Sequence, residues 1–334
     1  MILAGDIGGT NTRLAFFEGS AQRPVPVVSE VYPSRSHRGL EEILRIFWAA
    51  HQEPVESAAF GIAGPVKGGR CQTPNLPWNV DCASIAQFLG LSSAGLLNDL
   101  EANAHGIAVL GPDDFVTLYE GAPGATGNRA LISAGTGLGE AGLVAEGNEY
   151  RPYASEGGHA DFAPRTELEV ALLRHLWQLY DHVSYERVLS GPGLYNIYQF
   201  LRDTRRAEEP PSLAEELARR DPPRVIAEHA LEGDSPICTL AMEMLVSIYG
   251  AEAGNLALRA MATGGLYLGG GVAPKILPKL QEPIFLKAFR AKGRLSGFID
   301  AVPVRVIMND QTALLGAARV AFLACPQSRI AGAE

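Results

Sequence analysis

The sequence has few cysteines and no segment of the kind that directs secretion or crosses a membrane. Its four cysteines, in 334 residues, are scattered at Cys71, Cys82, Cys238 and Cys325, without a C-x-x-C pair. Structural zinc needs closely spaced ligands, and disulfide frameworks are typical of small secreted chains, so we expect reduced thiols, a cytoplasmic protein and no zinc. The opening residues, MILAGD, reach an acid and glycines too early for a signal peptide. No apolar run approaches the roughly 20 residues that span a bilayer, so we expect a soluble protein.

Basic residues are fewer than acidic ones, which argues against partners with a negatively charged surface. The chain has 28 Lys and Arg against 37 Asp and Glu, a formal net charge of -9, and no long basic run. This balance argues against binding to nucleic acid or to an anionic membrane. The P-loop pattern G-x-x-x-x-G-K-[ST] is absent. A G-x-G-x-x-G match at 137–142 is followed by a strand pattern, whereas the dinucleotide fingerprint must open a helix.

Length and pattern predict a two-lobed α/β protein. The chain of 334 residues exceeds what one core usually supports, and its 47% hydrophobic and 19% charged residues are typical of a globular chain. An apolar run, a glycine turn and a second apolar run occur at 2–17 and again at 130–145, and 266–271 echoes 60–64. We infer an internal duplication in which each lobe begins with a glycine-cornered hairpin, with strands alternating with helices.

The two glycine corners are suited to binding phosphate. In the first, Gly5–Arg13 (GDIGGTNTR), glycines at the hairpin tip let backbone N–H groups approach phosphate oxygens without a Cβ in the way. Asp6, at the strand end, is placed to hold Mg²⁺ through water. The second corner, Ser133–Gly139 (SAGTGLG), adds the hydroxyl of Thr136. Either corner alone is also compatible with an ordinary hairpin, but one in each lobe is what gripping ATP between two lobes requires.

A short strand is expected to end at Leu96–Leu97, and Asn98–Glu101 is expected to open a helix that runs to about Leu110. Asn98 as the N-cap and Glu101 three residues later form a capping box, and the helix dipole favours a negative charge at Asp99. The same geometry holds a carboxylate rigidly, where it can take the proton of a sugar hydroxyl that attacks phosphorus. Locally the capping explanation is the better one. Beside two phosphate corners, we assign Asp99 as a general base.

Glu156–His159 (EGGH) is a tight turn with a carboxylate and an imidazole at its ends. The two glycines make it a loop rather than a helix face, and no second His or Cys cluster lies nearby in sequence, which argues against a metal. Its ends suit hydrogen bonding to vicinal sugar hydroxyls, although a Gly-Gly turn with polar flanks is an equally good explanation. Glu186, in YERVLSG, is by itself typical of a solvated helix residue.

Together these segments resemble the bacterial glucokinase family, within the hexokinase, actin and heat-shock-ATPase fold superfamily. The resemblance implies a two-lobed actin-like ATPase (ribonuclease H-like) fold with an active-site cleft between a small lobe (1–109 plus 301–334) and a large lobe (110–300). It also implies hinge closure on sugar binding and a homodimer. The matching stretches occur in the family's order at Gly5–Asn11, Asn98–Asp99, Gly135–Gly139, Glu156–His159, Glu186–Gly191, Gly269–Val272 and Asn309–Asp310.

The resemblance implies a role for each matching residue. Asp99 is the expected general base, and the sugar hydroxyls are expected to contact Asn98, Asp99, Glu156, His159 and Glu186. ATP is expected to contact Gly5, Asp6, Ile7, Gly8, Gly9, Thr10, Gly135, Thr136, Gly137, Gly270 and Gly271, with Mg²⁺ held by Asp6 through water. Asn75 and Trp78 are expected to border the sugar. Many related kinases and repressors carry a Cys-rich zinc loop, and the lack of cysteine at 160–185 implies the zinc-free branch.

The expected activity is ATP-dependent phosphorylation of D-glucose to glucose 6-phosphate, which feeds glycolysis. Kinases for fructose, mannose or a hexosamine remain alternatives, as do ADP or polyphosphate as donors. A non-kinase actin-like or chaperone ATPase would need a polymerisation surface or a peptide-binding extension. A sugar-responsive repressor would need an N-terminal helix-turn-helix, whereas here a strand pattern begins at residue 2.

Overall fold

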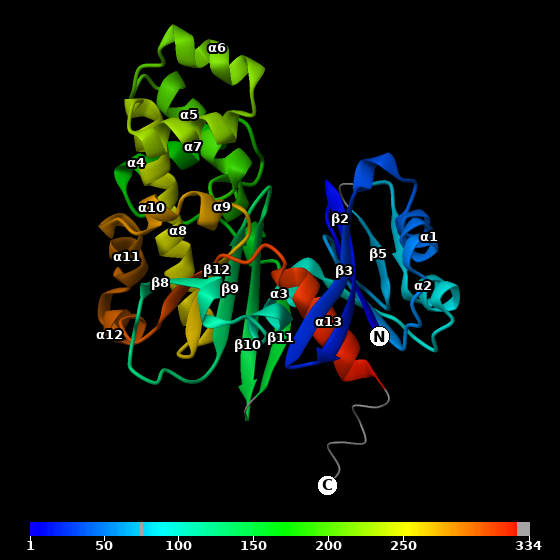
Figure 1. The fold of residues 1–334 in the computed structure, drawn as a ribbon. Helices are drawn as coiled ribbons and strands as arrows, with labels where there is room; N and C mark the ends of the chain where they lie inside the picture. Colours follow the sequence, from blue (N-terminus) through cyan, green and yellow to red (C-terminus); the bar gives the residue numbers. More distant parts are fainter. Residues whose placement is uncertain (74–75, 148, 326–334) are drawn as a thin grey trace. The chain divides into compact units, whose positions relative to one another are not determined.

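The computed structural model describes residues 1–73, 76–147 and 149–325, and its ribbon is drawn in Figure 1. Internal contacts divide the chain into two units. The first contains Met1–Pro112, Glu146–Ala154 and the chain from Asn309 onward, and the second contains Asp113–Ala145 and Ser155–Met308. Asn75, which we expected beside the sugar, lies outside the described residues.

The first unit is built on a five-stranded sheet in the order β3-β2-β1-β4-β7. The strands β1, β2 and β3 form an antiparallel meander, and β4 and β7 run parallel to β1. Because parallel strands end at the same edge, the ends of β1 and β7 lie one strand apart at that edge. Their bounds are β1 (Ile2–Ile7), β2 (Asn11–Ser20), β3 (Arg23–Pro33), β4 (Ser57–Ile62) and β7 (Gly95–Asn98), with the small sheet β5 (Arg70–Gln72) and β6 (Asn79–Asp81).

Helices cover both faces of this sheet. Alternate residues of β1 face opposite ways: Leu3 packs with the buried residues of α1 and α2, and Ile2 packs with those of α3 and α13. The helices α3 and α13 pack closely, since a Cβ added at Gly106 on α3 would lie 2.1 Å from the carbonyl oxygen of Thr312 on α13. The helices are α1 (Leu40–His51), α2 (Cys82–Leu89), α3 (Asp99–Ile107) and α13 (Thr312–Ala324), with the short 3-10 turn η1 (Ser34–Ser36).

The second unit is built on the strands β10-β9-β12-β13-β8 of a six-stranded sheet. The sheet order is β11-β10-β9-β12-β13-β8, and its edge strand β11 belongs, except for Ser155, to the first unit. The pairs β9–β10 and β13–β8 are antiparallel, whereas β12 runs parallel to both β9 and β13. The strands are β8 (Phe115–Tyr119), β9 (Arg129–Ala134), β10 (Leu138–Glu146), β11 (Glu149–Ser155), β12 (Gly265–Gly269) and β13 (Val304–Ile307). We had assigned 301–308 to the smaller lobe. Pairing of β13 with β12 and β8 places this segment in the second unit instead.

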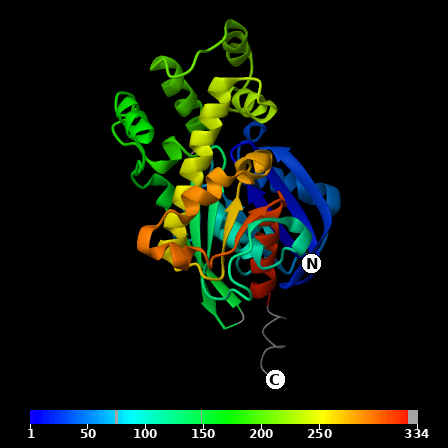
Figure 2. The same ribbon diagram turned by 90° about the vertical axis from the view of Figure 1, so that its left-hand side faces the viewer.

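The helices of the second unit gather around one long helix, α8, which packs against β9 and against α5, α7 and α11 (Figures 1 and 2). They are α4 (Glu167–Leu176), α5 (Gly191–Asp203), α6 (Pro211–Arg219), α7 (Pro222–Glu232), α8 (Pro236–Ala260), α9 (Val272–Lys275), α10 (Leu277–Leu280), α11 (Pro283–Arg290) and α12 (Ser296–Ile299). The 3-10 turns are η2 (Pro112–Asp114), η3 (Gly157–His159), η4 (Tyr185–Arg187) and η5 (Gly293–Leu295).

One helix departs from our expectation about apolar runs. Among the described residues, α8 is long and apolar enough, by length and composition alone, to cross a membrane. Of its most apolar stretch of 18 residues, 78% is buried inside the protein. A helix that is apolar on nearly all sides is typical of the centre of a large core, and α8 occupies that place in the second unit.

The two large sheets share one strand order, which confirms the internal duplication. Each sheet has an antiparallel meander followed by two parallel strands: β3-β2-β1-β4-β7 in the first and β11-β10-β9-β12-β13 in the second. The second sheet has one further strand, β8, at its edge. The registers agree as well: Asp6 lies beside Gly61, and Ser133 lies beside Gly269. Asp6 and Ser133 are therefore equivalent positions, each one residue before its strand ends.

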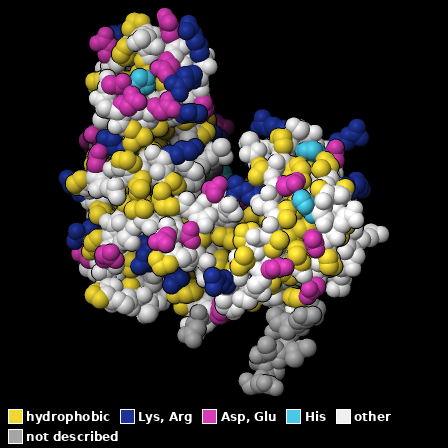
Figure 3. Space-filling model, in the orientation of Figure 1, with side chains coloured by type: hydrophobic (Ala, Val, Ile, Leu, Met, Phe, Trp, Pro, Cys, Tyr) yellow, Lys and Arg dark blue, Asp and Glu magenta, His cyan; other side chains and the backbone are white. Residues whose placement is uncertain are grey.

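Charged side chains of both signs lie together at the surface. On the face seen in Figure 3, acidic and basic groups lie side by side over α6 and α7, where Arg220 pairs with both Glu216 and Glu228, and Arg224 with Glu228. Paired opposite charges do not build the one-signed field that attracts a polyanion.

Candidate active site

The first glycine corner joins β1 to β2. The N–H of Gly8 donates to the carbonyl oxygen of Asn11 at 2.9 Å. Ser34 braces the turn, since its hydroxyl donates to the Gly8 carbonyl at 2.8 Å and its N–H donates to the Thr10 carbonyl at 2.9 Å. Gly8 and Gly9 are partly exposed and Thr10 is exposed, so a rigid corner presents its backbone at the surface, as phosphate binding requires.

Two residues of the same motif belong to the core beneath the corner. A Cβ at Gly5 would lie 2.4 Å from Cδ1 of Phe60, so this glycine is required by packing between β1 and β4. Ile7 is 1% exposed. The expected contribution of Gly5 and Ile7 to ATP binding therefore goes through the shape of the backbone rather than through a side chain.

Asp6 lies in a cluster of charged groups that the sequence analysis did not describe. Arg13 donates to the carboxylate of Asp310 at 3.0 Å and to its main-chain oxygen at 3.4 Å. Burial, and next the charge of Asp99, raise the pKa of Asp6 to about 6 against the opposing effect of Arg13, with Asp310 adding a smaller rise. Three carboxylates near one guanidinium leave a net negative charge, and such hard oxygen ligands fit Mg²⁺.

The junction of β7 and α3 fixes the expected catalytic carboxylate. The side-chain oxygen of Asn98 accepts from the Leu100 N–H at 2.9 Å, and Glu101 accepts from the Asn98 N–H, so the capping box is present. The Asn98 amide also donates to the Gly64 carbonyl at 3.0 Å, beside the end of β4. Oδ1 of Asp99 accepts from the same Leu100 N–H at 2.9 Å. Capping and catalysis are compatible, because the first turn holds the Asp99 carboxylate where the helix dipole favours its charge.

The second glycine corner joins β9 to β10. The N–H of Gly135 donates to the carbonyl of Gly137 at 2.9 Å, and β10 begins at the next residue. The chain thus continues as a strand, as expected when we excluded a dinucleotide fingerprint. Thr136 is exposed at the tip, and a Cβ at Gly135 would have nothing within 4 Å. This corner leaves open space in front of Gly135, into which a phosphate oxygen fits.

At Gly137, unlike at Gly135, the space for a Cβ is occupied by another side chain. A Cβ there would lie 2.5 Å from Oε2 of Glu186, and that same oxygen accepts a hydrogen bond from the Leu138 N–H at 3.0 Å. Glu186 belongs to the 3-10 turn η4 and is held by the start of β10, so its interpretation as a solvated helix residue was wrong. The structure thereby joins an expected hydroxyl ligand to an expected phosphate corner.

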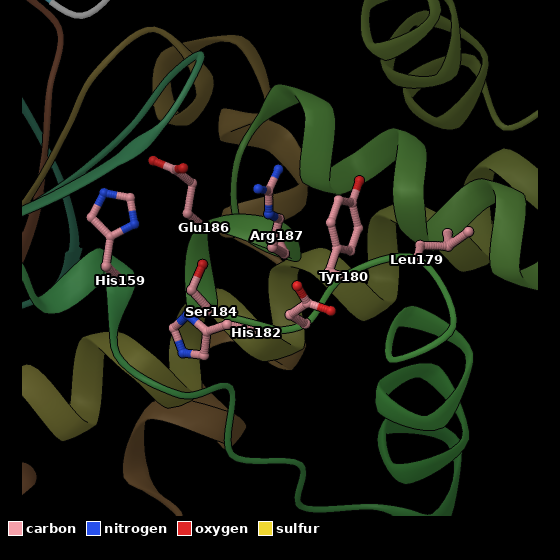
Figure 4. A pocket seen from close by; sticks show the side chains of 8 residues that line it. His159, Leu179, Tyr180, His182, Ser184, Glu186 and Arg187 are labelled. Carbon is pink, nitrogen blue, oxygen red and sulfur yellow. The ribbon is translucent and has the colours of Figure 1, made fainter.

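His159 and Glu186, which are 27 positions apart in sequence, line one pocket. The cavity measures about 390 Å³. Figure 4 shows His159 on η3 and Glu186 on η4 at one side of it, with Leu179 at the opposite side. The guanidinium of Arg187 lies 4.2 Å from the centre of the Tyr180 ring. The lining residues are His159, Leu179, Tyr180, Asp181, His182, Ser184, Glu186 and Arg187.

The remaining expected site residues have separate settings. Glu156 is exposed at the start of η3, and its carbonyl accepts from the His159 N–H at 2.9 Å. Gly270 has φ +77°, and a Cβ there would lie 2.3 Å from the carbonyl oxygen of Ala134, so the Gly270–Gly271 turn packs against the end of β9. Trp78 is 2% exposed and its indole N–H donates to the His37 carbonyl at 3.2 Å, which makes it a core side chain of the first unit.

One group among the described residues has the spacing of metal ligands. The ligand atoms of His229, Glu232 and Asp234 lie within 4.8 Å of one another. His229 is, however, already bound to Glu216 at 3.0 Å and to Asp234 at 2.8 Å. We assign no metal to this group, and the expected absence of zinc stays a prediction.

Comparison with known proteins decides the family. A family model described as Glucokinase matches residues 3–323. This chain belongs to the glucokinase family. A glucokinase of Nostoc sp. is 41% identical and aligns with 95% of this chain and 98% of its own. The crystal structure of a glucokinase from an Antarctic psychrotroph has a TM-score of 0.83 at 30% identity, covering 97% of this chain and 99% of that one. A ROK family glucokinase from Streptomyces griseus, solved in complex with glucose and AMPPNP, shares the fold with a TM-score of 0.64 at 23% identity, covering 97% and 99%.

These matches confirm the glucokinase family and the actin-like α/β fold, while the role of each residue stays a prediction. Sequence reasoning missed Arg13 and Asp310 as neighbours of Asp6, although both lay inside quoted segments. It also missed Glu140, which lies within the excluded G-x-G-x-x-G match. Glu140 could have been noticed because it is a charged residue inside an otherwise apolar strand. A charged side chain in such a place is usually buried and paired with an opposite charge.

Proposed function

We propose that this member of the glucokinase family transfers the γ-phosphoryl group of ATP to the 6-hydroxyl of D-glucose. Family membership over residues 3–323 supports this activity, and so does the Streptomyces griseus glucokinase, which was solved in complex with glucose and AMPPNP. The two glycine corners and the sugar-binding side chains supply the groups that such a transfer needs: backbone donors for phosphate, carboxylates for hydroxyls, and a base.

The observation that carries the proposal is the position of Glu186. Its carboxylate is fixed by the Leu138 N–H at 3.0 Å, immediately after the second glycine corner. A carboxylate held in this way has lone pairs left for two sugar hydroxyls, and His159 lines the same pocket. A hydroxyl-binding group placed beside a phosphate corner is the arrangement of a sugar kinase.

In the first unit, Asp99 is assigned as the general base that accepts the proton of the attacking hydroxyl. The N-terminus of α3 orients its carboxylate, and Asn98 closes the junction between β7 and the loop after β4. Phosphoryl transfer needs little covalent help from protein, so positioning and charge supply most of the rate.

Mg²⁺ fits the carboxylates around Asp6, as the donor set and its net negative charge indicate. When bound, Mg²⁺ would neutralise charge on the β- and γ-phosphates. The raised pKa of Asp6, about 6, expresses how poorly its charge is compensated by the protein alone. Asp6 would hold the ion through its water shell, while Arg13 keeps Asp310 aligned nearby.

A coupled assay of ADP release tests the proposal across glucose, mannose, fructose and glucosamine. We expect glucose to have the highest kcat/KM, with ATP as the donor and Mg²⁺ required. Activity confined to fructose, mannose or glucosamine would make the protein a different hexose kinase and leave the phosphoryl-transfer assignment standing. ATP hydrolysis that no hexose stimulates would contradict the kinase assignment itself.

We further propose that the protein works in the cytoplasm as a homodimer. The scattered cysteines, which are free in this structure, support the location, and the family resemblance supports the dimer. Light scattering on the purified protein tests the oligomeric state, and a single mass of one chain at micromolar concentration would contradict it.

A further inference from the structure

The turn η3 rests on the start of β10 at two points. A Cβ at Gly158 would lie 2.0 Å from the carbonyl oxygen of Leu138, and a Cβ at Gly157 would lie 2.0 Å from Oε2 of Glu140. Neither glycine has a positive φ, so space rather than backbone conformation requires glycine at both positions. The N–H of Leu138 also holds Glu186. The first residues of β10 therefore support both expected hydroxyl-binding turns.

Glu140 is itself held from α8. Its side chain is 1% exposed, and Glu252 on α8 is 0% exposed. One nitrogen of Arg259, Nη2, donates to Oε2 of Glu140 at 2.9 Å and also to Oε1 of Glu252. A single guanidinium thus bridges two buried carboxylates, one from the sheet and one from the helix.

The same group of residues reaches the second turn, η4. Asn255, one turn of α8 after Glu252, donates to Oε2 of Glu252 at 2.9 Å and to the hydroxyl of Tyr185 at 3.1 Å. Tyr185 is the residue before Glu186 and is 3% exposed. Lys292 donates to the side-chain oxygen of Asn255 at 2.6 Å and so fixes its amide. Through these contacts α8 touches η3 by way of Glu140 and η4 by way of Asn255.

The pKa of the buried Glu140 carboxyl lies above its ordinary value. Burial, and next the charge of Glu252, raise the pKa of Glu140 against the lowering effect of Arg259. Within the described residues, Oε1 of Glu140 has no hydrogen-bond partner. Burial and a neighbouring negative charge both favour the neutral form of the Glu140 carboxyl. A neutral glutamine is therefore a close mimic of Glu140 in its protonated form.

We propose that Glu140, Glu252, Asn255 and Arg259 form a positioning network that fixes the two hydroxyl-binding turns and so sets the affinity of the enzyme for its sugar. The inference rests on the proposed function. None of the four is assigned a contact with the reacting atoms. Loosening the turns weakens sugar binding in the ground state and the transition state alike, which raises KM for glucose and leaves kcat unchanged.

The decisive variant is Glu140→Ala, which keeps the ion pair between Glu252 and Arg259. We expect KM for glucose to rise about 10-fold, with kcat and KM for ATP within about 2-fold, because only uniform sugar binding is lost. In Glu140→Gln the amide replaces the neutral acid, so KM should return to within about 3-fold of the wild type.

A matched control is Glu169→Ala. Glu169 is also buried, 4% exposed, and its carboxylate accepts from the N–H of Arg165 at 2.6 Å and from its guanidinium at 3.2 Å. This variant loses a buried glutamate–arginine pair on α4, so it should lower the melting temperature and keep KM for glucose. If Glu140→Ala lowers the melting temperature like the control and leaves KM unchanged, Glu140 is merely structural and the proposal is wrong.

Tyr185→Phe tests the other arm of the network and removes one oxygen only, so folding is preserved. We expect KM for glucose to rise about 3-fold with kcat retained. An unchanged KM in both Tyr185→Phe and Glu140→Ala would overturn the network. Calorimetric titration with glucose separates this outcome from failure of the proposed function: a wild-type protein that binds glucose without phosphorylating it contradicts the function alone, and the Kd values of the variants then decide the network.

Discussion

The two glycine corners occupy the same place in two sheets of the same strand order, yet they differ in charge. Asp6 in β1 is equivalent to Ser133 in β9, since each lies beside a glycine of the next parallel strand. The first corner brings a carboxylate there, beside the Arg13–Asp310 pair. The second brings a serine, and the carboxylate of Glu186 lies beside this corner, where it comes from a turn distant in sequence and is held by a backbone N–H.

This difference shows how a duplicated scaffold divides one reaction. Under the proposed function, each corner keeps the same backbone because both must approach phosphate without a Cβ in the way. The side chains diverge: the first unit concentrates negative charge suited to a cation and a base, and the second unit has its proposed hydroxyl-binding groups on loops outside the repeated strands. Substitutions in the first corner should therefore lower kcat, whereas substitutions in the second corner should raise KM for a substrate.

The largest effect is expected from Asp99→Asn in the first unit. The amide cannot accept the hydroxyl proton, so kcat should fall by roughly 10²-fold or more, while the Kd for glucose changes little. Steady-state kinetics and calorimetry with glucose measure the two quantities. The exposed Asp113→Asn on η2 is a matched change of charge that should keep wild-type turnover. Near-normal turnover of Asp99→Asn would remove this residue from the chemistry.

Asp6→Ser gives the first corner the residue of the second. We expect kcat to fall at least about 10-fold and the Mg²⁺ requirement to rise, because the carboxylate that anchors the hydrated ion is lost. The same change should stabilise the fold at pH 7 by about 1–3 kcal/mol, since burial raises the pKa of Asp6 to about 6 and its charge opposes folding. Denaturant unfolding and Mg²⁺ titrations measure both.

The test is that Asp6→Ser should lower activity but raise stability. If Asp6→Ser loses both activity and stability, the carboxylate is a structural group and the contrast between the corners is wrong. Adding Ser133→Asp to the same chain moves the carboxylate to the second corner. It should not restore turnover, because that corner lacks the partners Arg13 and Asp310.

A pair of alanine substitutions separates the two glycines of the second corner. Gly137→Ala places a Cβ 2.5 Å from Glu186, so it should displace this carboxylate and raise KM for glucose about 5-fold. Gly135→Ala meets nothing within 4 Å and should leave KM for glucose unchanged. If Gly135 faces phosphate, its variant should raise KM for ATP instead. Equal effects of both variants on both substrates would contradict the separate roles.

Much of this arrangement could be predicted from the sequence, and the limits have physical causes. Repeated apolar runs around glycines indicated the duplicated sheets, because strand and turn preferences are local. The capping box at Asn98 was likewise readable from residues three apart. The function of Glu186 was not, since its hydrogen bond to Leu138 joins positions 48 apart. Nor does any local pattern show why Gly157 must be glycine, because the group that excludes a Cβ is the carboxylate of Glu140 in another strand.

One buried histidine makes the first unit sensitive to acid. His105, on α3 in the first unit, has its Nδ1 buried without a hydrogen-bond partner among the described residues. Burial, and next the charge of Arg319, lower the pKa of His105 to about 4. A histidine with a lowered pKa is protonated more readily in the unfolded chain, so stability is lost as the pH falls from about 6.5 toward 4. Asp6 in the same unit and Glu140 in the second unit act in the opposite sense, because their raised pKa values favour folding at low pH.

His105→Gln removes the titrating group, so the variant should lose less stability than the wild type between pH 6.5 and pH 4.5. The expected difference is about 1–3 kcal/mol, the upper value corresponding to the whole shift from the ordinary pKa. Trp48 and Trp78 lie in the first unit and Trp177 in the second, so fluorescence of a Trp177→Phe background reports on the first unit alone. If acid unfolds this background and its His105→Gln derivative at the same pH, the buried imidazole is not the acid-sensitive group.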